Sequence, residues 1–126
     1  MAKDYFVKAD GSDELACSCG CGLTIRTSTR ARLNRVRERF GKPISAAGAR
    51  CPNNLFYSGH TSSHGDREDE GFTPPCAIDI MNTSKSDRKE ILEIAIDEGF
   101  VRWGIGNNQL HIDDDESKPV TYWIYS

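Results

Sequence analysis

Apolar residues recur at helical spacing between residues 27 and 40, and arginines occupy most of the positions between them. In a helix with 3.6 residues per turn, this spacing places the apolar side chains on one side and the arginines toward solvent. Thr27 or Ser28 can cap the beginning of this helix, and Gly41 can end it. The apolar side of the predicted helix consists of Leu33, Val36 and Phe40.

A second helical pattern runs from Lys85 to Glu98. Ser84, followed three residues later by Asp87, resembles a capping box, in which the serine hydroxyl accepts a backbone hydrogen bond at the start of a helix. Gly99 can end the helix, because glycine readily adopts the left-handed conformation found at helix ends. The apolar stripe of this predicted helix consists of Ile91, Leu92, Ala95 and Ile96.

Short apolar stretches outside the helices predict β-strands. They cover residues 44–47, 77–81, 100–105, 109–113 and 120–125. We expect an antiparallel sheet in which the strand containing Tyr122 pairs with the strand containing His111. Two helices and such a sheet make a small α+β fold, and a chain of 126 residues suits a single domain spanning residues 1–126.

The charge balance argues against nucleic acid as a partner. The chain has 16 Lys and Arg residues and 19 Asp and Glu residues, for a formal net charge of -3. The arginines of the first helix are therefore interpreted as a solvated face. No apolar run approaches the roughly 18 residues that span a bilayer, and the first residues lack the apolar core of a secretory signal. We expect a monomer made in the cytoplasm, without membrane insertion.

Asp79 lies in an apolar run of strand length, Ala-Ile-Asp-Ile-Met at 77–81. Such a run is usually buried, and a buried carboxylate without a partner is costly or takes up a proton. Asp79 therefore predicts a neighbouring cation, which could be a metal ion. The alternative is a structural ion pair, for example with Arg50.

His111 lies in a second strand-like segment, between Leu110 and Ile112. Residues two apart in a strand share a face, so Asp113 should point in the same direction as His111. Imidazole and carboxylate groups are the N and O ligands of catalytic zinc sites, where three protein ligands leave a fourth position for water. Asp113 could orient the histidine or accept the proton of that water.

Four segments together provide a resemblance to a known family. They are Ser-Ala-Ala-Gly-Ala-Arg-Cys-Pro-Asn-Asn at 45–54, Ser-Ser-His at 62–64, Ala-Ile-Asp-Ile at 77–80 and His-Ile-Asp at 111–113. In this order they resemble the zinc peptidases of the D-Ala-D-Ala carboxypeptidase family, and most of all the branch with short phage endolysins and carboxypeptidases that act on bacterial peptidoglycan. The resemblance spans about residues 14–114. It implies a fold like that of Hedgehog proteins and these peptidases, with zinc bound at the sheet.

The resemblance also implies roles for individual residues. Zinc would be bound by His64, Asp79 and His111, and Arg50 would bind the substrate carboxylate or steady the site. Ser62 is a further substrate-binding candidate. The implied activity is zinc-dependent hydrolysis of peptide bonds in peptidoglycan stem peptides, and a protein made in the cytoplasm would reach the wall or periplasm only after release.

Two features depart from the family pattern. Fourteen residues separate His64 from Asp79, where the family usually has a short spacing, and Asn108 stands where many members have an acidic residue. Asp113 is then the first candidate for the catalytic base. The alternatives in the inserted segment are Glu68, Asp69 and Glu70. His60 also follows a Ser-x-His pattern, but His64 fits the family pattern better.

Two weaker patterns concern further metals. Cys17, Cys19 and Cys21, with Cys51 as a distant partner, could bind a second zinc, although this is not the usual Cys-x-x-Cys spacing. We interpret the three clustered cysteines as structural and Cys76 as a small buried hydrophobic residue. The acidic run at 66–70 could bind Ca²⁺, although its spacing matches no ordinary calcium loop.

Three functions are therefore compared. The first is the zinc peptidase, which could be a phage or prophage endolysin. The second is a zinc-containing binding module with the same fold and no catalysis, which the missing acid at position 108 would favour. The third is a structural protein in which Asp79 pairs with Arg50 and no metal binds.

Overall fold

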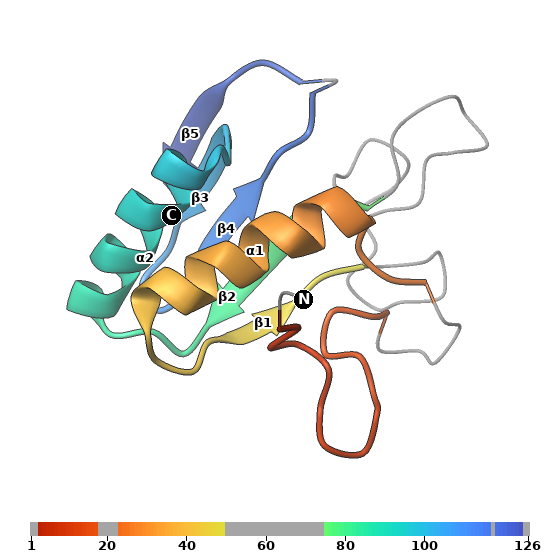
Figure 1. The fold of residues 1–126 in the computed structure, drawn as a ribbon. Helices are drawn as coiled ribbons and strands as arrows, with labels where there is room; N and C mark the ends of the chain where they lie inside the picture. Colours follow the sequence, from red (N-terminus) through yellow and green to blue (C-terminus); the bar gives the residue numbers. More distant parts are fainter. Residues whose placement is uncertain (1–2, 18–22, 50–74, 117, 125–126) are drawn as a thin grey trace.

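The computed structural model describes residues 3–17, 23–49, 75–116 and 118–124. Within these ranges, two helices and five strands form an α+β fold (Figure 1). Their order is α1 (Thr27–Phe40), β1 (Ser45–Ala47), β2 (Ala77–Met81), α2 (Lys85–Glu98), β3 (Arg102–Ile105), β4 (Leu110–Asp113) and β5 (Thr121–Ile124). Both predicted helices and all five predicted strands are confirmed, with strand ends that differ by one or two residues.

The two helices begin in different ways. At α2, the Ser84 hydroxyl accepts a hydrogen bond from the Asp87 backbone N–H at 3.2 Å, as the capping box predicts. At α1, the N-cap is Arg26, and no side chain caps the helix, so the expected cap at Thr27 or Ser28 is wrong. The start of α1 is instead set by tertiary contacts, because the Arg26 backbone N–H donates to the Pro75 carbonyl at 2.9 Å.

The sheet has the strand order β1-β2-β4-β3-β5 and is mixed, which corrects the expected antiparallel sheet. The first four strands are antiparallel neighbours, but β5 runs parallel to β3 and does not pair with β4. β4 already has β2 on one edge and β3 on the other, so β5 cannot pair with β4 and lies instead at the outer edge of β3. The chain returns from Asp113 to Thr121 beside Arg102, the first residue of β3, and continues in the direction of β3.

The two faces of the sheet differ because side chains alternate along each strand. One face supplies fully buried apolar residues of the core, Ile78, Ile80, Leu110 and Ile112. Figure 1 shows α1 lying across the sheet with α2 beside it, and the core also contains Leu33 and Val36 of α1 and Ile91 and Ala95 of α2. The residues between these strand positions, among them Asp79, His111 and Asp113, belong to the opposite face.

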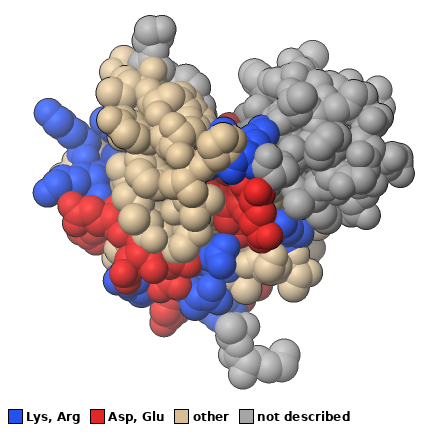
Figure 2. Space-filling model, turned by 90° about the horizontal axis from the view of Figure 1, so that it is seen from above, with Lys and Arg blue, Asp and Glu red and all other residues tan. Residues whose placement is uncertain are grey.

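The surface carries both signs of charge. On the face drawn in Figure 2, acidic and basic side chains are interspersed beside a larger area without charged residues. None of the helices in the described ranges has the length and apolar composition needed to cross a bilayer.

The N-terminal segment is attached to α1 through Asp13. One of its carboxylate oxygens accepts hydrogen bonds from Arg30 Nη2 at 2.6 Å and Thr24 Oγ1 at 2.5 Å, and the other accepts from the Leu15 backbone N–H at 2.9 Å. Burial raises the pKa of Asp13, but the hydrogen bonds from Arg30, Thr24 and Leu15 outweigh it, so the pKa lies below its ordinary value. The ionised carboxylate therefore stabilises the folded state.

This pKa shift predicts a pH-dependent effect of Asp13→Asn. A lowered pKa contributes stability above the unfolded value of about 4, and this contribution is lost as the pH falls through the folded value. We expect the variant to be less stable than wild type at pH 7, with a difference that shrinks toward about pH 2. Urea unfolding of both proteins across this range measures it, and a difference that stays constant would contradict the assignment.

Candidate metal site

A row of residues crosses the sheet on the face away from the helices. Asp79 in β2 lies opposite His111 in β4, His111 lies opposite Gly104 in β3, and Gly104 lies beside Trp123 in β5. Asp113 is two residues beyond His111 and therefore on the same face. The alternation of apolar and polar residues in β2 and β4 is what places Asp79, His111 and Asp113 together here.

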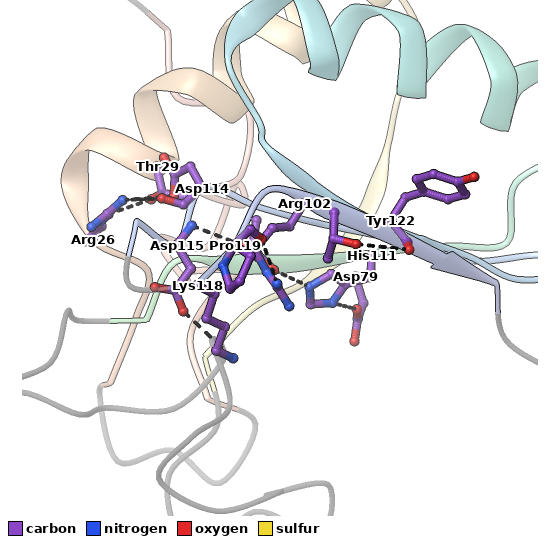
Figure 3. Close-up of polar contacts among 12 residues, drawn as sticks. Arg26, Thr29, Asp79, Arg102, His111, Asp114, Asp115, Lys118, Pro119 and Tyr122 are labelled. Carbon is purple, nitrogen blue, oxygen red and sulfur yellow. Dashed lines mark hydrogen bonds and ion pairs between the residues drawn. The ribbon is translucent and has the colours of Figure 1, made fainter.

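The His111 ring lies between two carboxylates. Its Nδ1 is 3.1 Å from Asp79 Oδ1, and its Nε2 is 2.7 Å from Asp113 Oδ2. All three side chains are buried, with relative exposures of 8% for Asp79, 7% for His111 and 0% for Asp113. Figure 3 shows the Asp79 and His111 side chains next to each other, with Arg102 nearby. Both ring nitrogens therefore face negative charge in a buried site.

This environment affects the protonation of His111. Burial lowers the pKa of the imidazole, but the hydrogen bonds with Asp113 and Asp79 and the negative charges of these two residues outweigh burial. The pKa of His111 therefore lies above its ordinary value. The site favours positive charge on the ring or beside it.

Asp113 has further partners besides His111. Arg102 Nε lies 3.2 Å from Asp113 Oδ1 and 3.3 Å from Oδ2, and the Asp115 backbone N–H donates to Oδ1 at 3.1 Å. Arg102 also donates from Nη1 to the Pro119 carbonyl at 3.1 Å. Both oxygens of Asp113 are thus engaged on the Nε2 side of the ring, away from Asp79.

The Asp79 and His111 pair has the geometry of two neighbouring metal ligands. Two ligands that are each about 2.1 Å from a tetrahedral zinc ion lie about 3.4 Å apart. The observed separation of 3.1 Å between Asp79 Oδ1 and His111 Nδ1 is close to this value. Metal-binding histidines also usually donate their second N–H to a carboxylate or carbonyl, as Nε2 can donate to Asp113. The residues present therefore fit a zinc ion bound on the Nδ1 side.

Several predicted site residues lie outside the described residues. They are Arg50, Ser62 and His64, the base alternatives Glu68, Asp69 and Glu70, and the alternative histidine His60. Arg50 of the predicted ion pair with Asp79 and the acidic run considered for Ca²⁺ fall in the same segment, so both stay predictions. Within residues 3–17, 23–49, 75–116 and 118–124, no group of three His, Cys, Asp or Glu side chains could hold a metal. Of the predicted site residues, Asp79, His111 and Asp113 are the three that the structure brings together.

Asn108 and the cysteines lie elsewhere. Asn108 is exposed in the turn between β3 and β4, where its backbone carbonyl accepts a hydrogen bond from the Thr83 N–H at 3.1 Å. Cys76 is fully buried, as expected of a small hydrophobic residue, and Cys17 is buried at 3% exposure. Cys19, Cys21 and Cys51 lie outside the described residues, so the second zinc site stays a prediction.

Sequence reasoning did not identify three residues of this site, Arg102, Gly104 and Trp123. A glycine inside a strand often marks a close approach of another group to the backbone, so Gly104 was a usable signal. Arg102 and Trp123 carried no comparable signal, because Arg102 reaches Asp113 through the pairing of β3 with β4, and Trp123 reaches His111 through the pairing of β5 with β3.

Comparison with known proteins leaves the chain without an identified relative. No family model matches it, and no curated protein and no solved structure shows significant similarity to it.

Proposed function

We propose that this protein is a zinc-dependent peptidase that hydrolyses peptide bonds in bacterial peptidoglycan stem peptides. The observation that carries the proposal is the arrangement around His111, with Asp79 3.1 Å from Nδ1 and Asp113 2.7 Å from Nε2. This is the combination of a neighbouring ligand and an orienting carboxylate that metal-binding histidines use. The resemblance of residues 14–114 to the D-Ala-D-Ala carboxypeptidase family supports the substrate class and the finer Hedgehog-like fold.

In this proposal, Asp79 and His111 bind zinc together with His64. Zinc in such a site lowers the pKa of a bound water to about 7 and polarises the scissile carbonyl. Asp79 would supply a carboxylate oxygen to the metal, and His111 would supply Nδ1. The Nε2–H of His111 would donate a hydrogen bond to Asp113. Arg50, with its planar guanidinium, and Ser62 bind the carboxylate end of the substrate peptide.

Asp113 acts in this proposal as a positioning residue for His111. Its two oxygens are occupied by His111, Arg102 and the Asp115 N–H, and its side chain is fully buried. A general base must be within hydrogen-bond reach of the proton that it removes, which favours a group on the Nδ1 side of the ring. We assign the proton transfer to the acidic segment, with Glu68, Asp69 and Glu70 as candidates, and give Asp113 the orienting role.

The test is digestion of purified peptidoglycan followed by mass spectrometry of the released fragments, with and without a zinc chelator. We expect new fragments that disappear with the chelator and return when zinc is restored, and their masses identify the bond cleaved. A protein shown to carry zinc that leaves the peptidoglycan unchanged would contradict the peptidase. Such a protein would instead be the zinc-containing binding module, which Asn108 in place of an acid and the engaged oxygens of Asp113 favour.

If the peptidase is confirmed, we propose an enzyme of the endolysin type, made in the cytoplasm and released to the wall. In that case a monomer without a nucleic-acid partner is sufficient for activity. Ca²⁺ bound by the carboxylates of residues 66–70 remains a second proposed metal.

A further inference from the structure

Gly104 allows the Trp123 side chain to lie across β3. A Cβ atom built on Gly104 would lie 2.4 Å from Trp123 Nε1 and 2.5 Å from Cε2, closer than real Cβ contacts. The indole therefore occupies the space that any other residue at position 104 would fill. Gly104 is the register partner of His111 in β4 and of Trp123 in β5. The indole that lies over Gly104 therefore points toward the His111 ring.

The Trp123 indole packs against the candidate metal site. Its ring centroid is 5.1 Å from that of His111, with an angle of 49° between the planes, and the Arg102 guanidinium lies 5.1 Å from the indole centroid. Trp123 is half-buried, whereas its neighbours in β5, Tyr122 and Ile124, are 63% and 72% exposed. Trp123 thus contacts both His111 and Arg102, the residue that pairs with Asp113.

We propose that Trp123 is a positioning residue for His111 and that Gly104 is the position that admits it. The carboxylates of Asp79 and Asp113 hold the two ring nitrogens of His111. The indole packs against the imidazole and restricts rotation of the ring away from these two carboxylates. Trp123 also covers Arg102, which keeps the Arg102–Asp113 pair partly shielded from water and therefore stronger. The role in zinc binding rests on the proposed function, but the orientation of His111 does not.

The first test uses zinc-free protein and nitrogen NMR of the histidine side chains. The chain has three histidines, and His111→Gln assigns the signals of His111. We expect wild type in slightly acidic buffer to show slowly exchanging Nδ1–H and Nε2–H signals, because the Asp79 and Asp113 carboxylates accept from both nitrogens of a fixed ring, and Trp123→Ala to show both signals broadened or lost to exchange with water. Trp123→Phe, which keeps an aromatic ring, should restore most of the wild-type pattern. His111 N–H signals that exchange as slowly in a folded Trp123→Ala protein as in wild type would overturn the proposal.

The second test measures zinc affinity by competition with a chromophoric chelator. Residues that orient a metal ligand typically contribute about 10–100-fold to affinity, so we expect a loss in this range for Trp123→Ala and Gly104→Ala. Tyr122→Ala is the matched control, because Tyr122 lies in the same strand but stacks on Trp103 at 6.3 Å on the other face. Equal zinc affinity in wild type and a folded Trp123→Ala protein would overturn the role in metal binding.

The two tryptophans of the chain give a third readout that does not require the alanine variants to fold. With Trp103→Phe, Trp123 is the sole tryptophan and can be excited apart from the four tyrosines, and we expect zinc to change its emission, whereas Trp123→Phe should respond little. Constant emission from Trp123 while zinc binds would contradict the contact. Wild type that binds no zinc but shows a fixed His111 ring would contradict the proposed function alone.

Discussion

His111→Ala is expected to abolish both zinc retention and peptidoglycan cleavage. The substitution removes a metal ligand and leaves the Asp79 and Asp113 carboxylates in a buried site without the ring between them. Loss of a residue that only orients a ligand costs about 10–100-fold in affinity or activity, so loss of the ligand itself should exceed this range. Zinc content by mass spectrometry and the chelator-sensitive digest measure the two effects.

Three further variants make this result specific. His64→Ala should behave like His111→Ala, whereas His60→Ala should keep its zinc and activity; the reverse would assign the third ligand to His60. Asp113→Asn should bind zinc about 10–100-fold more weakly and recover activity when zinc is saturating, as expected of a positioning residue. An Asp113→Asn protein with saturated zinc and no activity would instead make Asp113 the base. Full activity of His111→Ala would end the zinc-peptidase proposal.

Asp114→Ala is expected to lower the free energy of unfolding more than Asp13→Asn or Asp97→Ala. Asp114 is 3% exposed, and its carboxylate accepts hydrogen bonds from Arg26 Nη2 at 3.0 Å, Arg32 Nη1 at 2.5 Å and Thr29 Oγ1 at 2.7 Å. These bonds connect the end of β4 to the beginning of α1, as Figure 3 shows for Arg26 and Thr29. Removing one partner of a fully buried ion pair costs about 3–5 kcal/mol. We expect a loss at or below the lower end of this range, because the Arg26 and Arg32 side chains that lose their partner are 15% and 31% exposed.

Urea unfolding of Asp114→Ala and wild type measures this loss. Asp97→Ala is the matched control, because Asp97 pairs with Arg39 at 2.7 Å with side-chain exposures of 70% and 44%. Exposed pairs contribute little, so the control should unfold close to the wild-type midpoint. Equal losses in the two variants would mean that the Asp114 contacts do not stabilise the connection between α1 and β4.

The sequence by itself determined the elements and the faces of the strands. Helical spacing of Leu33, Val36 and Phe40 and the Ser84 cap located the two helices, because periodicity and capping act over a few neighbouring residues. The same local logic placed Asp79 among buried apolar residues and put His111 and Asp113 on one face. These three residues are the part of the candidate site that the structure brings together.

Tertiary structure alone decided which strands became neighbours. β5 cannot pair with β4, because β2 and β3 already occupy both edges of β4, and it runs parallel to β3 at the outer edge of β3. No property of residues 121–124 indicates this pairing. That pairing brings Trp123 over Gly104 to His111, and the fold also brings Arg102 to Asp113 and Arg26 to Asp114. Such contacts depend on open edges and on long-range charge pairs, which are properties of the assembled chain and not of any local pattern.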